Sequence, residues 1–415
     1  MRQNWGMRTP DGYRVAIVSR IFAPEPGAAS FRLTALCRAL QSAGAAVTVL
    51  TTDPPRGAFS LPDLGGAQVR RSPVLRDRAG YVRGYLQYMS FDVPAFFRLL
   101  FLRRVDVVVV EPPPTTGVVV GIAAWLRRKP YIYYAADVWS EAVRETNAPA
   151  FVAWTVRALE RFAMARAAVV LAVSDDVARR VGELAPRARV ATIGNGVDDA
   201  VFTWEGESQS IGGPYLLYIG TASEVHGAMV FVEAMPAVLA EHPDARLVFV
   251  GQGSDWELIA ARGAELAPGA ILQQSRVDPE RAAEWIRGAR ATLASTVPGG
   301  YVAFPTKMLA SAACGTPTVY AGGEPGATFA REPGVGWAVD HDPVAVADAM
   351  IAALARDAEP SHRRELSDWT HQNHTLRAVA ERAVDALRGV VPCDAPSRAA
   401  QPPSAGREGD QDVRP

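Results

Sequence analysis

Lysine is almost absent from this chain of 415 residues: Lys129 and Lys307 are the only two, while arginine and alanine are abundant. This bias is typical of a GC-rich genome and by itself indicates no mechanism. The net charge is −1, so no overall electrostatic field favours binding to nucleic acid. Any site for an anion must therefore be local.

Cysteine is also scarce. Cys37, Cys314 and Cys393 are too widely spaced to form a disulfide framework or a zinc-binding pattern. Cys37 and Cys314 lie in apolar helical patterns, which is typical of small core residues rather than of nucleophiles. No cluster of histidine and aspartate and no D-x-D dipeptide at a strand end indicates a metal site, so we expect no metal and no cofactor.

Long uninterrupted apolar runs are missing too. The best candidate for a membrane span, residues 105–126, contains Asp106, Glu111 and three prolines, so we do not expect it to cross a bilayer. No signal peptide precedes the first predicted strand. Hydrophobic residues make up 49% and charged residues 21% of the chain, as in ordinary soluble globular proteins. We therefore expect a cytoplasmic protein.

What the chain does contain is a regular alternation of strands and helices. Strand–loop–helix units begin at residues 13–19 and again at residues 215–220. This pattern predicts an α/β protein with two Rossmann-like, doubly wound domains that face each other across a cleft. The predicted segments are a flexible N-terminus (1–12), a first domain (13–198), a linker (199–214), a second domain (215–360), C-terminal helices that pack back toward the first domain (361–391) and a disordered tail (392–415).

The stretch over residues 304–324 reads as a loop, a helix, a tight turn and a buried strand. Pro305 suits the first turn of a helix, and Gly315 suits the position after its end, where φ is positive. Lys307 would add a full positive charge to the free N–H groups of the helix start, a combination that suits a diphosphate. The alternative is an ordinary packed helix with one surface lysine.

Three segments of the first half are candidates for a ligand site. The loop over residues 20–29 follows the first strand, and Gly27 would let the backbone approach a ligand there. Ser30 is expected to cap the next helix. Asp137-Val-Trp-Ser-Glu141 follows a strand and indicates either a site or a helix capped by Asp137. Residues 81–102, aromatic with interspersed arginines, predict a helix pair at an acceptor cleft, a surface that touches lipid, or a core helix.

Five stretches of the chain match one known family in the right order. They cover residues 22–32, 137–141, 173–176 with 195–198, 218–221 with 226–227, and 304–307 with 314–317. In these stretches the chain resembles retaining glycosyltransferases of family 4 with the GT-B fold, especially the bacterial branch that builds polysaccharides and related glycosides.

The resemblance implies that the second domain holds a nucleotide-sugar donor and that the first domain holds the acceptor. Transfer would retain the anomeric configuration and need no metal, and Lys307 would stabilise the leaving diphosphate. His226 stands where many family members have a lysine and would contact phosphate if protonated; the alternative is a packed loop histidine. The implied site residues are Asp137 and Lys307 for catalysis; Gly27, Thr221, His226, Thr306, Lys307 and Glu324 for the diphosphate and sugar; Arg276, Val277 and Ala310 for the base and ribose; and Glu25, Arg32, Trp139 and Glu141 for the acceptor.

The chain departs from the family at several positions, among them Thr221, where an arginine is usual, and Gly299-Gly300, where an acidic loop is common. Val302 and Ala310 stand where two glutamates are usual, and losing the carboxylate on the ribose would cost about 1.5–3 kcal/mol. Either Glu324 replaces it, or the donor is unusual, or the chain is catalytically idle.

The function expected from these features is sugar transfer to a soluble small molecule in specialised, antibiotic-like biosynthesis. One alternative is transfer to a lipid-linked sugar in polysaccharide assembly, with peripheral contact at the inner membrane face. Another is an inactive relative that binds a partner protein. An epimerase of the same fold would need cleft carboxylates that the sequence does not place.

Overall fold

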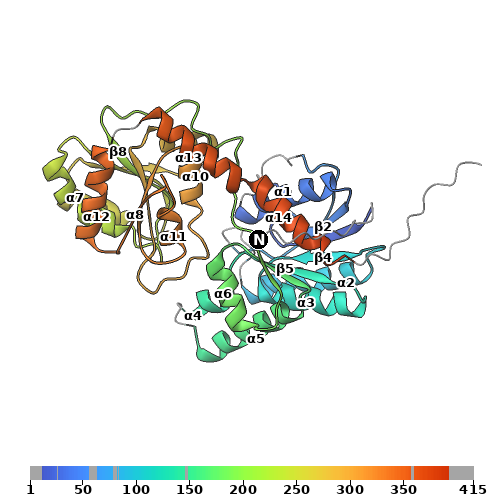
Figure 1. Ribbon diagram of the computed structural model, residues 1–415. Helices are drawn as coiled ribbons and strands as arrows, with labels where there is room; N and C mark the ends of the chain where they lie inside the picture. The colour runs from blue at the N-terminus through green and yellow to red at the C-terminus, as the bar shows by residue number, and fades with distance from the viewer. Residues whose placement is uncertain are drawn as a thin grey trace, which may run out of the picture.

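The computed structural model of the protein describes residues 12–25, 27–55, 63–77, 82, 84–144, 148–356 and 359–391. Within these ranges the chain forms two lobes, each built on one parallel sheet (Figure 1). The flexible start predicted for residues 1–12 and the disordered tail predicted for 392–415 lie outside the described residues, except for Gly12.

The first lobe contains seven parallel strands in the order β3-β2-β1-β4-β5-β6-β7. Their bounds are β1 Arg14–Val18, β2 Ala46–Thr52, β3 Gln68–Ser72, β4 Val107–Val110, β5 Tyr131–Ala135, β6 Val169–Ala172 and β7 Val190–Thr192. The helices are α1 Ala28–Ser42, α2 Tyr85–Leu100, α3 Pro114–Leu126, α4 Trp139–Arg144, α5 Ala150–Arg166 and α6 Asp175–Leu184. Helices cover both faces of the sheet, so all four valines of β4 are buried.

The second lobe repeats this plan with six parallel strands in the order β10-β9-β8-β11-β12-β13. The strands are β8 Tyr215–Thr221, β9 Arg246–Gln252, β10 Ile271–Ser275, β11 Ala291–Ser295, β12 Thr318–Ala321 and β13 Gly336–Val339. The helices are α7 Met229–Glu241, α8 Trp256–Leu266, α9 Pro279–Gly288, α10 Lys307–Ala313, α11 Gly326–Ala330 and α12 Pro343–Ala355. Strand order reverses between β1 and β4 and between β8 and β11, which is where ligands bind in such sheets.

The chain ends with two helices that lie on different lobes. Helix α13 (Pro360–Asn373) packs on α10, whereas α14 (Leu376–Arg388) crosses back and packs on α1 (Figure 1). The apolar side of α14, which includes Val384 and Leu387, is buried in the core of the first domain. The chain passes between the lobes twice, after β7 and between α13 and α14, and these two segments are hydrogen-bonded to each other. Val197 N–H donates to the His374 carbonyl (2.8 Å), and Leu376 N–H donates to the Val197 carbonyl (2.9 Å).

Residues 199–214, between the two sheets, contain no helix or strand. They nevertheless pack on the second domain. The buried guanidinium of Arg287 donates to the carbonyl oxygens of Glu207 (2.8 Å) and Thr203 (3.1 Å). These bonds fix the connecting segment against α9.

Two local predictions need correction. Helix α1 begins at Ala28 with Gly27 as its N-cap, so Ser30 lies inside the helix and does not cap it; its hydroxyl donates to the Glu25 carbonyl instead. Residues 85–100 form one helix, α2, which contains Pro94, rather than a helix pair. Among the described residues no helix is long and apolar enough to cross a membrane.

Candidate active site

A cavity of about 250 Å³ lies at the carboxyl ends of β1, β4 and β5, where the first sheet reverses its strand order. Its polar lining consists of Ser19, Arg20, Arg32, Glu111, Asp137 and Trp139. The structure therefore brings together three residues predicted for the site, Arg32, Asp137 and Trp139. It adds Arg20 and Glu111, which sequence reasoning missed although Glu111 directly follows β4 and Arg20 lies two residues after β1.

Arg32 and Glu111 form a nearly buried ion pair in the wall of this cavity. The Arg32 Nε and Glu111 Oε1 atoms are 2.6 Å apart, and Ser19 donates to the other carboxylate oxygen at 3.3 Å. Burial disfavours the Arg32 cation, but the contact with Glu111 outweighs it and raises the pKa of Arg32. Arg32, on the first turns of α1, is thus held in one place by Glu111, the residue that follows β4.

Arg20, also in the cavity lining, lies close to two aromatic rings. Its guanidinium carbon is 4.8 Å from the centre of the Tyr88 ring and 5.7 Å from that of Trp139. Burial lowers the pKa of Arg20, although Tyr88 and nearby carboxylates, Glu111 among them, oppose the shift. The buried Nε atom of Arg20 has no hydrogen-bond partner among the described residues. Arg20 therefore keeps one N–H group buried and unsatisfied in the wall of the cavity.

The Asp137 segment is positioned by a glutamate from another helix. Glu160, fully buried on α5, accepts hydrogen bonds from Trp139 N–H (2.8 Å) and Ser140 N–H (2.9 Å) at the start of α4. Glu160 thus takes the capping role that the sequence suggested for Asp137. The Asp137 carboxylate accepts from the N–H of Val138 (3.0 Å) and lines the cavity.

A side chain from the second domain closes over this segment. Tyr301, in the loop after β11, is buried, and its hydroxyl accepts from Val138 N–H at 2.9 Å. Burial and the nearby Asp137 carboxylate raise the pKa of Tyr301 well above the ordinary value for tyrosine. Ser174, at the start of α6, donates to the Ala303 carbonyl at 2.9 Å. The loop therefore joins the two domains at the predicted catalytic aspartate.

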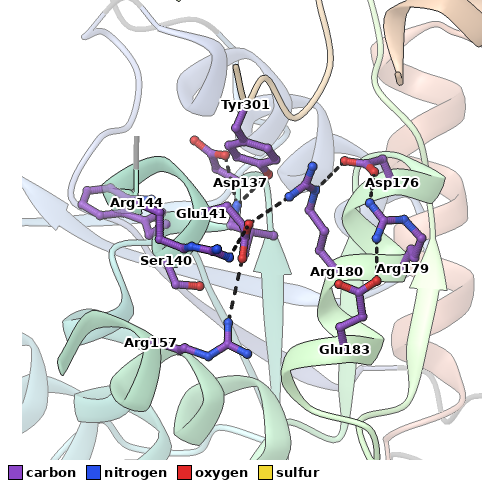
Figure 2. Close-up of polar contacts among 12 residues, drawn as sticks. Asp137, Ser140, Glu141, Arg144, Arg157, Asp176, Arg179, Arg180, Glu183 and Tyr301 are labelled. Carbon is purple, nitrogen blue, oxygen red and sulfur yellow. Dashed lines mark hydrogen bonds and ion pairs between the residues drawn. The ribbon is translucent and has the colours of Figure 1, made fainter. Parts of the chain in front are cut away.

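Figure 2 shows that Glu141 belongs to a network of arginines around Tyr301 rather than to the cavity lining. Its carboxylate pairs with Arg180 (3.0 Å) and Arg144 (3.5 Å), and Arg180 also pairs with Asp176 (2.7 Å). The guanidinium of Arg180 lies 4.7 Å from the centre of the Tyr301 ring. Glu141 thus holds the arginine on which Tyr301 rests.

Glu25, also predicted for the acceptor side, is likewise engaged elsewhere. Its carboxylate pairs with Arg76 at 2.9 Å, and it does not line the cavity. Gly27 lies next to it at the start of α1, with extended rather than left-handed backbone. Glu25 therefore fixes the loop before α1 to residues beyond β3.

In the second domain Lys307 is the centre of the predicted donor site. Its ammonium group donates to the Tyr218 hydroxyl at 2.9 Å and lies 4.0 Å from the centre of the Tyr218 ring. No carboxylate of the described residues forms an ion pair with it. Burial lowers the pKa of Lys307 to about 7. A Cβ atom on Gly220 would lie 3.7 Å from Lys307, an ordinary van der Waals contact, so it is the positive φ of 122° that favours glycine beside the lysine.

His226 lies close enough to Lys307 to be affected by its charge. Burial first, and then Lys307, lowers the pKa of His226 to about 4, so the imidazole is neutral at neutral pH. Its Nδ1 atom is 2.8 Å from the Ser223 hydroxyl. A phosphate contact from a protonated His226 therefore does not fit this arrangement near pH 7.

The remaining predicted donor residues are dispersed around the second sheet. Thr221 ends β8 and Thr306 begins α10, and both are exposed. Arg276 is exposed after β10, at the edge of the sheet, while Val277 and Ala310 pack in a hydrophobic cluster. The Glu324 carboxylate accepts from Thr328 N–H (2.9 Å) and pairs with Arg331 (3.2 Å), so α11 already uses it.

The described residues contain no group of three or more histidine, cysteine, aspartate or glutamate side chains that could hold a metal ion. At the switch point of the first sheet the charged residues are Arg20, Arg32, Glu111 and Asp137, and at that of the second sheet the charged residue is Lys307. Such a site can bind an anion on one side and a polar, hydroxyl-bearing molecule on the other.

Two Rossmann-like domains, each built on one parallel sheet, define the class of GT-B proteins. Comparison with known proteins then identifies the family. Residues 27–196 match the glycosyl transferase 4-like domain, and residues 213–356 match the glycosyl transferases group 1 domain. The chain therefore belongs to the glycosyltransferases of the GT-B, family 4-like type, as its sequence motifs predicted.

Individual relatives are distant. D-inositol 3-phosphate glycosyltransferase of Acidothermus cellulolyticus is 29% identical over 220 residues, which cover 49% of this chain and 47% of the relative. The match thus spans about half the length of that protein. Sucrose-phosphate synthase of Thermosynechococcus elongatus has a similar fold, with 17% identity, a TM-score of 0.68, and coverage of 91% of this chain and 98% of the other. HepE of Anabaena, solved with UDP and glucose, is 14% identical with a TM-score of 0.63, and the match covers 90% of this chain and 98% of HepE.

Proposed function

We propose that this protein transfers a sugar from a nucleotide diphosphate-sugar to an acceptor bound in the first-domain cavity, with retention of configuration and without a metal. The observation that carries the proposal is Lys307. A lysine that pairs with no carboxylate of the described residues, held against an aromatic ring at a sheet switch point, is a site prepared for an anion.

The chemistry of glycosyl transfer explains why such a lysine is useful. The bond to the sugar breaks through an oxocarbenium-like state, and negative charge collects on the leaving diphosphate. A donor group aimed at that charge in a partly desolvated site stabilises the transition state more than the ground state. The Tyr218 hydroxyl and ring fix the position of the Lys307 ammonium before the diphosphate arrives. The Anabaena relative was solved with UDP, which makes a uridine nucleotide the first donor to test.

The acceptor side is the cavity around Asp137. The acceptor hydroxyl would lie near the Asp137 carboxylate, while Arg20 supplies a positive charge in the cavity wall and Trp139 an apolar face. Tyr301 ties this segment to the loop that leads into Lys307, so donor and acceptor groups are held in one frame.

The acceptor proposed from the sequence is a soluble small molecule of specialised metabolism, used in the cytoplasm. Transfer to a lipid-linked sugar at the membrane face is the second candidate, and the exposed apolar helices described below favour it. The catalytically idle alternative rests on Val302 and Ala310, which bring no carboxylate to the donor side.

The experiment is a thermal-shift screen with UDP, GDP, dTDP and ADP and their common sugars. A ligand present at about 100 times its dissociation constant stabilises the folded protein by about 2.7 kcal/mol, which is visible as a higher melting temperature. We expect one base to stabilise the wild type and to have no effect on Lys307→Ala, whose affinity should fall at least about tenfold. Stabilisation without turnover of any sugar donor would favour the idle alternative. No response to the whole panel would contradict the proposal.

A further inference from the structure

Helices α2, α3 and α5 lie side by side along one face of the first sheet, with α3 in the middle (Figure 1). A helix at the surface of a globular protein normally turns polar residues outward. Helix α3 instead presents Ile122, Trp125 and Leu126 to solvent, and Trp125 is 70% exposed. Its outward surface is therefore as apolar as the surface that faces the core.

The neighbouring helices extend this apolar surface. On α2 the exposed residues Leu86, Val93 and Phe97, followed by Phe101 at the C-cap, are spaced by seven, four and four positions. That spacing places them in one stripe about 22 Å long. On α5, Phe151 and Trp154 are each 71% exposed. We call these nine residues the outer face: Leu86, Val93, Phe97, Phe101, Ile122, Trp125, Leu126, Phe151 and Trp154.

The exposed charged side chains of these three helical segments have a single sign. The only carboxylates in residues 85–104, 114–129 and 150–166 are Asp92 and Glu160, and both are fully buried. The exposed charged residues of the same segments are all arginines: Arg103, Arg104, Arg128, Arg157, Arg161 and Arg166. Arg157 is paired with Glu141 (3.8 Å), so five of these arginines are left to give the apolar, aromatic face a surplus of positive charge.

We propose that the outer face docks on a lipid bilayer that contains anionic lipids. Tryptophan and phenylalanine insert at the headgroup level, arginines extend to the phosphates, and each basic residue near an anionic surface adds attraction. A second copy of the chain fits less well, because a symmetric interface would bring the same arginines together. The proposed contact is a surface one, and in the part of the chain that the structure describes no helix is long and apolar enough to cross a membrane.

The position of the outer face connects it to the acceptor cavity. Tyr88, on α2, packs edge-to-face against Trp139, with ring centres 6.0 Å apart, and Trp139 lines the cavity. The stripe on α2 begins at Leu86, two residues before Tyr88. A bilayer on this face would therefore lie beside the cavity, which makes a membrane-borne, lipid-linked acceptor the class that fits. This part of the inference rests on the proposed function.

The test is flotation of the full chain with vesicles of phosphatidylcholine alone or mixed with phosphatidylglycerol. We expect the wild type to float with the anionic vesicles and to bind the neutral ones at least tenfold less. Phe101→Glu and Trp125→Glu should each reduce the bound fraction at least tenfold. Leu258→Glu is the matched control, because Leu258 is 62% exposed on α8 of the second domain. This substitution should leave the fraction bound to vesicles unchanged. Circular dichroism melting checks that all variants are folded.

Two results would overturn the inference. One is absence of flotation with anionic vesicles. The other is a dimer, measured by light scattering, that Phe101→Glu and Trp125→Glu dissociate, because the face would then bind a second copy. Nucleotide affinity is measured by calorimetry on the same samples. Lost vesicle binding with intact nucleotide binding contradicts only the docking inference, whereas vesicle binding without nucleotide binding contradicts only the proposed function.

Discussion

Replacing Lys307 by methionine should make the protein more stable and at the same time unable to hold its donor. Methionine keeps the length and most of the apolar stem of lysine but carries no charge. The ammonium of Lys307 sits against the Tyr218 ring without a carboxylate partner, and burial lowers its pKa to about 7. The charged form is therefore disfavoured in the folded protein that has no ligand.

The size of this effect follows from the two pKa values. The difference between the ordinary 10.5 and about 7 corresponds to an upper limit of roughly 5 kcal/mol against the folded state below pH 7. Water at the partly exposed side chain and the lost bond to Tyr218 reduce the gain, so we expect Lys307→Met to add about 1–3 kcal/mol to the unfolding free energy at neutral pH.

The sign of the pH dependence is fixed by the same pKa values. Between about pH 7 and 10.5 the unfolded chain binds more protons than the folded one, so Lys307 makes stability rise with pH in this window. Donor binding should show the opposite trend, because the diphosphate requires the charged lysine. With a free pKa of about 7, the dissociation constant of a nucleotide sugar should rise roughly tenfold from pH 6 to pH 8.

The composition of the chain makes the assay direct. Reductive methylation with carbon-13 labels only Lys129, Lys307 and the terminal amine, so NMR can follow each lysine during a titration. Lys129→Met is the matched control, since Lys129 lies on the first domain near Asp106 (3.6 Å). We expect calorimetry to find nucleotide-sugar binding unchanged in Lys129→Met and lost in Lys307→Met.

Two results would refute this reasoning. If the Lys307 signal titrates near 10.5, the site does not disfavour the cation. If Lys307→Met binds the nucleotide sugar with unchanged affinity and unchanged pH dependence, Lys307 does not contact the diphosphate.

Three further predictions concern the first domain and its contact with the second. Glu111→Gln should leave Arg32 without its partner and lower the unfolding free energy by about 3–5 kcal/mol in urea denaturation; an unchanged midpoint would contradict the pairing. Tyr301→Phe should remove one of the two acceptors of the Val138 N–H, which keeps its bond to Asp137, and cost about 0.5–1.5 kcal/mol by the same assay; wild-type stability would mean that the bond to Tyr301 contributes nothing. Glu160→Ala should free two N–H groups at the start of α4 and cost about 1–2 kcal/mol, seen as faster hydrogen exchange there; unchanged exchange would exclude this capping role.

Much of the fold could be predicted because its determinants are local. Buried parallel strands such as β4 are short runs of valine, and the alternation of such runs with helical patterns predicts doubly wound sheets. The same reasoning placed Asp137 at the end of β5 and Lys307 at the start of α10. Both lie where strand ends and helix starts collect ligands.

The details of the site could not be predicted because they depend on distant residues. Tyr301 and Val138 are 163 positions apart, and no local pattern indicates that they touch. Glu160 caps α4 from 21 positions away and so takes the role suggested for Asp137. The neutral state of His226 depends on burial and on Lys307, neither of which its own loop reveals.

The path of the chain through α14 also has a consequence for the order in which the protein forms. The core of the first domain includes Val384 and Leu387, which are made after the whole second domain. During synthesis the apolar surface of α1 that α14 covers would therefore stay exposed until α14 leaves the ribosome. A fragment that ends before α13 should be prone to aggregate, and a chimaera that exchanges donor domains should retain α14 with the first domain.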